Sequence, residues 1–105
     1  SEQGVLSAMC ENMDAFYERY GTRIRDELFF HPARRILAHA MVDLHVSAQP
    51  VDIITITNFL RRSGALDKVG GAGGVTDLLP VEFSPMYAVE HYLAELEDMA
   101  ARRRL

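Results

Sequence analysis

Residues 32–44 read PARRILAHAMVDL, and their apolar side chains recur every three or four positions. This spacing places them on one face of an α-helix that can pack into a core. Pro32 suits the first helical turn, because its missing N–H would have had no partner there. The sequence therefore predicts a core helix that begins at Pro32, with a buried face made of Ala33, Ile36, Leu37, Ala40, Met41 and Leu44.

The segments on either side carry the same periodicity. One-sided apolar stripes predict helices over residues 2–12 and 13–20, and a short helix over residues 75–79. Residues 26–30 are expected to form a connecting turn with two aromatic anchors, Phe29 and Phe30. The glycine-rich run at 70–74 is expected to be a loop that joins two helices.

Residues 51–63 carry conflicting signals. The β-branched run Val51–Thr57 favours a strand by propensity. However, Asp52 is a good N-cap, and Gly64 is a typical C-terminal stop. Apolar residues at helical spacing also continue through Phe59 and Leu60, so we predict a helix and place both side chains in the core.

A long helix is predicted at the end of the chain. Ser84 and Pro85 provide a capping residue and a proline for the first turn, and the pattern continues to about Arg104, or roughly 30 Å at 1.5 Å per residue. A stripe at alternating spacings of three and four is typical of a helix–helix seam. Because a projecting helix would leave this stripe in water, we predict a self-association surface; the alternative is burial within the helix's own bundle. The seam consists of Met86, Val89, Leu93, Leu96 and Ala100, widened by Tyr92 and Met99.

These elements predict an all-α fold, a small orthogonal bundle of five or six helices with a long C-terminal helix. Residues 1–83 would form a globular head, and residues 84–105 the first arm of a dimerisation hairpin, within a single domain. The 105 residues suit one domain, and the single cysteine excludes an internal disulfide, which favours a reducing, cytoplasmic compartment. No apolar run approaches the ~20 residues of a membrane span.

The net charge of −4 favours protein partners over nucleic acid, because phosphate contacts require cations. The basic run 102–104 could touch DNA, but cations also stabilise the C-terminus of a helix, where Asp98 and Arg102 would pair. We prefer the second interpretation.

Catalytic, cofactor-binding and metal sites are not predicted. The glycine run lacks the Lys-Ser or Lys-Thr that completes a phosphate-binding loop. Cys10 lies on an apolar stripe, as a buried and unreactive thiol would. The histidines form no tight constellation with it, and we interpret them as surface residues, with His39 paired to Asp43. Those histidines are His31, His39, His45 and His91.

Five segments, taken in order, resemble the N-terminal domain of the DnaB family of replicative DNA helicases. Residues 1–9, SEQGVLSAM, resemble an opening helix that reads E-Q-S-V-L-G-A. Residues 26–36, DELFFHPARRI, resemble D-F-Y-x-P-A-H-R-x-I, and residues 49–56, QPVDIITI, resemble E-P-V-D-x-V-T-V. Residues 63–71 resemble G-x-L-x-x-V-G-G, and residues 86–105 resemble the start of a helical hairpin. The likeness covers nearly the whole chain.

The resemblance implies a non-catalytic helical head with a hairpin that pairs between subunits, in a dimer or in a hexameric ring beside the motor domain. It also implies docking of a primase, and in some systems of a helicase loader, during DNA replication. ATP, Mg²⁺ and DNA would be bound by a motor domain that lies outside this chain, which reads as a piece of a longer protein. The alternatives are a standalone helical adaptor and a DNA-binding helical domain, the second disfavoured by the negative charge.

Overall fold

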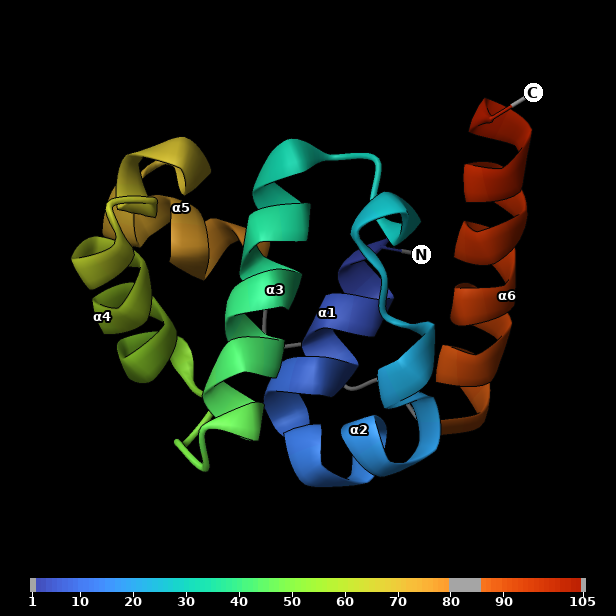
Figure 1. The fold of residues 1–105 in the computed structure, drawn as a ribbon, viewed down its shortest axis with the longest axis horizontal. Helices are drawn as coiled ribbons and strands as arrows, with labels where there is room; N and C mark the ends of the chain where they lie inside the picture. The colour runs from blue at the N-terminus through green and yellow to red at the C-terminus, as the bar shows by residue number, and fades with distance from the viewer. Residues whose placement is uncertain (1, 80–85, 105) are drawn as a thin grey trace.

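Six α-helices and three 3₁₀ turns make up the described part of the chain (Figure 1). The structure is a computed structural model, and it describes residues 2–79 and 86–104, with only the backbone at residue 86. No strand occurs within these ranges, which confirms the predicted all-α fold. The elements are α1 (Glu2–Glu11), α2 (Met13–Tyr20), η1 (Gly21–Arg23), η2 (Asp26–Leu28), α3 (Pro32–Val46), α4 (Ile53–Ser63), η3 (Leu66–Val69), α5 (Gly71–Leu78) and α6 (Met86–Arg103).

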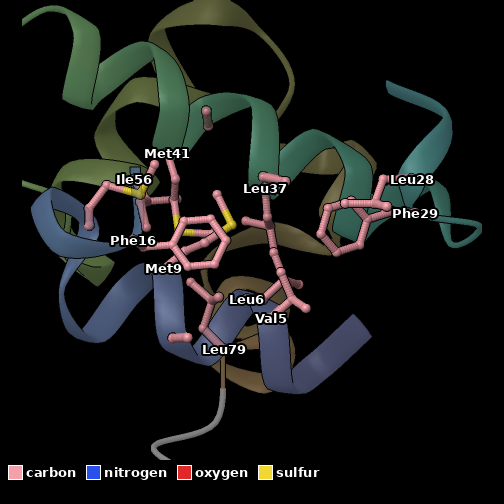
Figure 2. Packing of buried hydrophobic residues seen from close by; sticks show 14 of the residues in the cluster. Val5, Leu6, Met9, Phe16, Leu28, Phe29, Leu37, Met41, Ile56 and Leu79 are labelled. Atoms are coloured by element: carbon pink, nitrogen blue, oxygen red, sulfur yellow. The ribbon is translucent and has the colours of Figure 1, made fainter. Parts of the chain in front are cut away.

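Helix α3 occupies the middle of the molecule. It lies between α4 and α5 on one side and α1 on the other, and α6 forms the far edge beyond α1 (Figure 1). One continuous core joins these helices. Figure 2 shows Met9, Phe16 and Met41 gathered at one end of this core, and Leu28 with Phe29 at the other.

The predicted core helix begins at Pro32, as expected, and continues to Val46. Its predicted face is buried at Ala33, Leu37, Ala40, Met41 and Leu44. Ile36 was expected in the core as well, but it is only partly buried and packs against the edge of the cluster. Because α3 contacts helices on two sides, its buried surface is wider than one stripe and also takes in Ala38.

Helix α4 resolves the conflict over residues 51–63. The Asp52 carboxylate accepts a hydrogen bond from the Thr55 N–H at 2.8 Å, and the Asp52 N–H donates to the Thr55 hydroxyl at 3.0 Å. This capping box satisfies two free N–H groups. Gly64 ends the helix in the left-handed conformation, at φ 79°. Leu60 is buried as predicted, whereas Phe59 is only partly buried at the edge of the core.

The expectation that residues 70–74 form a loop is wrong. The turn is confined to Gly70 and Gly71, whose φ angles are 91° and 75°, and α5 already begins at Gly71. A Cβ at Gly74 would overlap the carbonyl oxygen of Val69, so glycine lets the first turn of α5 lie directly against η3. The glycines therefore provide a tight turn and a close helix contact.

The last helix is described from Met86 to Arg103, or about 27 Å at 1.5 Å per residue. The predicted cap at Ser84 and Pro85, and the predicted boundary between 83 and 84, lie outside the described residues. Among the described helices, none is both long and apolar enough to cross a membrane.

Candidate protein-docking surface

Four side chains of the predicted α6 seam face their own chain. Val89 and Leu93 are fully buried, Leu96 is 2% exposed and Ala100 is 4% exposed. Helix α6 packs against α1, and Val89, Leu93 and Leu96 belong to the same core cluster as α1. For these four side chains, the structure therefore shows burial within the helix's own bundle, which the sequence analysis gave as the alternative to self-association. They could contact a second subunit only if α6 separated from α1.

The contact between α1 and α6 depends on a small residue. An ideal Cβ placed on Gly4 would lie 2.7 Å from Cε2 of Tyr92, which is closer than side-chain atoms normally approach. Glycine therefore leaves room for the Tyr92 ring against α1. This explains why Tyr92, one of the predicted seam residues, is half-buried.

An ion-pair network also fixes α6 to the rest of the domain. The guanidinium of Arg23 donates two hydrogen bonds to the Glu97 carboxylate, at 2.6 and 3.0 Å, and a third to Glu90 at 3.1 Å. The hydrogen bonds between Arg23 and Glu97 raise the pKa of the guanidinium and lower the pKa of the carboxyl. Both groups are therefore charged at neutral pH, and they join η1 to the middle of α6.

Two apolar side chains remain exposed near the C-terminal end of α6. Met99 is 52% exposed, and Phe30, in the connection before α3, is 68% exposed. Phe29 is buried as an anchor, but the expectation that Phe30 is a second anchor is wrong. The backbone at Phe29 is extended, so successive side chains point to opposite sides.

Phe30 and Met99 line a shared groove of about 640 Å³. It lies between the starts of α1 and α3 and the last turns of α6. Leu96 contributes the most deeply buried apolar side chain. The lining is completed by Glu2, His31, Arg34, Arg102 and Arg103.

Comparison with known proteins places this fold in one family. Residues 1–98 match the family described as DnaB-like helicase N terminal domain. The chain belongs to that family. It is also similar in structure to the crystal structure of the N-terminal domain of DnaB helicase from Mycobacterium tuberculosis, with a TM-score of 0.82 and 31% identity, over 99% of this chain and 73% of that chain.

Full-length relatives have the same domain at a comparable level of identity. The whole chain is 35% identical to the replicative DNA helicase DnaB of Mycobacterium leprae, of which it spans 17%. It is 30% identical to replicative DNA helicases of Geobacillus stearothermophilus and Bacillus subtilis, named DnaB and DnaC, and spans 23% of each. This DnaB-like domain therefore corresponds to about a fifth of the length of these relatives.

The polar residues that the sequence singled out lie mostly on the surface of the DnaB-like domain. His39 pairs with Asp43 at 3.2 Å, as predicted, and Asp98 pairs with Arg102 at 3.0 Å. His31 and His91 are exposed, and His45 lies at the rim, where its ring packs at a tilt against Tyr17 and pairs with Asp14 at 3.2 Å. Within the described ranges, no three His, Cys, Asp or Glu side chains gather as metal ligands would.

Cys10 is half-buried rather than fully buried. Burial raises the pKa of its thiol, with a smaller contribution from the Asp52 carboxylate. The neutral thiol is therefore favoured at neutral pH, and it is a poor nucleophile.

The sequence analysis did not predict the groove, although it singled out several of its residues, among them Phe30, Leu96 and Met99, for other roles. Its residues come from three separate segments, and no helical periodicity connects them. The available signal was the pair Phe29–Phe30, since two adjacent aromatic residues in extended backbone cannot both enter one core.

Proposed function

We propose that this chain is the non-catalytic N-terminal domain of a cytoplasmic replicative DNA helicase. In this role it supports assembly of the subunits into a hexameric ring and docks a primase, or a helicase loader, during DNA replication. One observation carries the proposal: the family match over residues 1–98, together with replicative helicases that align along the whole chain.

The sequence of the domain supports a role without nucleotide chemistry. The glycine run at 70–74 has Lys68 before it, whereas a phosphate-binding loop needs a lysine directly after it. The run also follows the 3₁₀ turn η3 rather than a strand. ATP and Mg²⁺ would therefore bind to the motor domain of the parent protein, and DNA would be contacted mainly through that motor domain.

The role in assembly depends on surfaces that the core leaves free. Val89, Leu93 and Leu96 stabilise the domain from inside, so pairing between subunits would use the outer side of α6. Tyr87 and Met99 are the large apolar side chains that remain exposed along the described part of this helix. The self-association surface proposed here therefore keeps Met99 from the predicted seam and adds Tyr87.

The experiment compares the complete protein encoded by the reading frame, the same protein without residues 1–105, and the chain alone. We expect ATP hydrolysis from both proteins that carry the motor domain and none from the chain alone. In sedimentation velocity experiments, the complete protein should form hexamers and bind the primase of the same organism, and deletion of residues 1–105 should weaken both. ATP turnover by the chain alone, or a reading frame without a motor domain, would overturn the proposal; the second result would favour a standalone adaptor.

A further inference from the structure

We propose that the groove between the start of α3 and the end of α6 binds an acidic segment of a partner protein through an apolar anchor residue. The inference rests on the docking role proposed above and gives that role a location and a chemistry. The occupant would be a short segment that carries one or two apolar side chains flanked by aspartate or glutamate.

The size and floor of the groove fit an apolar anchor. Its volume of about 640 Å³ lies within the range of roughly 300–1,000 Å³ that is typical of ligand sites. Phe30, Leu96 and Met99 supply the apolar lining, and two of them are exposed despite their size. Burial of a leucine or phenylalanine side chain among them would remove apolar surface from water on both partners.

The charge around this floor is opposite to that of the chain as a whole. The chain has a net charge of −4, whereas the lining holds three arginines and one acidic residue. That acidic residue, Glu2, is already engaged. Its carboxylate accepts a hydrogen bond from the Phe30 N–H at 2.6 Å and pairs with Arg34 at 3.3 Å, and its side chain is only 13% exposed. Glu2 and Arg34 therefore neutralise each other within the wall.

Arg102 and Arg103 remain available to an acidic partner. The ion pair between Arg102 and Asp98 is largely exposed on both sides, so its net stabilisation is small and a partner carboxylate could replace it. Arg103 donates its hydrogen bond, at 2.6 Å, to the backbone carbonyl of Glu27, which is a neutral acceptor. That bond holds the guanidinium in place without neutralising its charge.

The groove is also ordered before any partner binds. The Arg103 guanidinium lies over the Phe30 ring at 5.3 Å from its centroid, in a cation–π contact. The Phe30 backbone is held by Glu2. Because these side chains are fixed in advance, little side-chain entropy would be lost when a partner docks.

The same features favour a peptide over single-stranded nucleic acid. Nucleic acid would need open aromatic faces on which bases stack, along a basic track. Here the Arg103 guanidinium covers one face of Phe30, and the rest of the apolar lining is aliphatic, from Leu96 and Met99. The cations surround one apolar pocket, which suits a short acidic segment with one anchor.

The test uses a fluorescein-labelled ten-residue peptide with two leucines flanked by aspartate and glutamate, titrated with the chain and followed by fluorescence anisotropy. We expect saturable binding that weakens as KCl is raised. Arg103→Glu and Met99→Asp should each weaken binding by about tenfold or more, as changes at central contacts do. Matched controls are Arg62→Glu, an exposed arginine on α4, and Ile54→Asp, an exposed apolar residue on the same helix, and both should bind within about twofold of the native chain.

Several results would overturn the groove as a peptide site. These are equal binding of a peptide with alanine in place of the leucines, equal loss in the two control variants, or an oligothymidylate that binds more tightly than the peptide and loses affinity in Phe30→Ala. Circular dichroism shows whether each variant is folded, and Arg103→Gln supplies a milder change if Arg103→Glu is not.

The peptide assay contains neither primase nor motor domain, so its failure is distinct from failure of the proposed function. Peptide binding without primase binding would support the groove and overturn the primase role. Primase binding that is insensitive to Arg103→Glu, in a chain that binds no peptide, would overturn the groove.

Discussion

Leu93 offers a direct test of whether α6 is part of the core of this domain. Its side chain is fully buried on the face of α6 that packs against α1. Leu93→Ala removes apolar contacts and leaves a cavity, which for a fully buried leucine costs about 2–5 kcal/mol of unfolding free energy. A cost of about 3 kcal/mol, with a urea slope of about 1.5 kcal/mol per molar, lowers the urea midpoint by roughly 2 M.

The measurement is urea unfolding followed by the helical circular dichroism signal, with Met99→Ala as the matched control on the exposed side of the same helix. We expect the control to change the unfolding free energy by less than about 0.5 kcal/mol, as exposed positions usually do. If Leu93→Ala is as mild as the control, then Leu93 is not packed inside its own chain. The seam would then be free for a second subunit. Because both side chains are buried, we expect charged substitutions at Leu93 and Leu96 to unfold the domain instead of separating subunits.

Three further predictions follow from local contacts. Glu97→Gln should lower the free energy of unfolding by only about 0.5–1 kcal/mol at pH 7, since its partner Arg23 is partly exposed. Because folding lowers the pKa of Glu97, the difference between the native chain and the variant should be complete above about pH 4.5 and vanish as acid protonates the folded carboxyl. Urea unfolding at several pH values would measure it. A difference that persists at pH 2 would contradict it. Asp52→Ala should cost about 1 kcal/mol through loss of the capping box, measured by thermal unfolding, and an unchanged melting temperature would count against the cap. Gly73→Ala should stabilise α5 by about 0.5–1 kcal/mol, because a Cβ at this position meets open space. Gly74→Ala should destabilise α5, because the added Cβ would collide with the Val69 carbonyl. Equal effects of the two substitutions in thermal melts would refute this contrast.

The elements of the fold could be predicted because their signals are local. The cap at Asp52 and the stop at Gly64 defined α4 despite its β-branched residues, since tertiary packing and capping outweigh propensity. The start of α5 was misplaced, because glycines in a helix carry no periodic signal and the contact between Gly74 and Val69 is visible only in three dimensions.

The candidate site was harder to predict for a physical reason. An apolar stripe on a helix is the same pattern whether it packs against its own chain or against another subunit. The burial of Leu93 and Leu96 against α1 depends on where α6 lies in three dimensions, which periodicity does not encode. The groove, in turn, is formed by residue 2, residues 30–34 and residues 96–103, so that no single segment of the sequence shows it.

The packing of α1 against α6 also matters for the nascent chain. Helix α1, with Val5 and Leu6 on its apolar side, is covered by α6, which the ribosome synthesises about 90 residues later. At about 5–20 residues per second, roughly 5–20 s pass between translation of Leu6 and of Leu96. During that interval the apolar face of α1 has no partner from α6 and is open to chaperones or to neighbouring chains on the same messenger RNA. The separation of the two helices along the sequence thus delays the burial of the apolar face of α1, and the delay would be shorter if the helices were adjacent in the sequence.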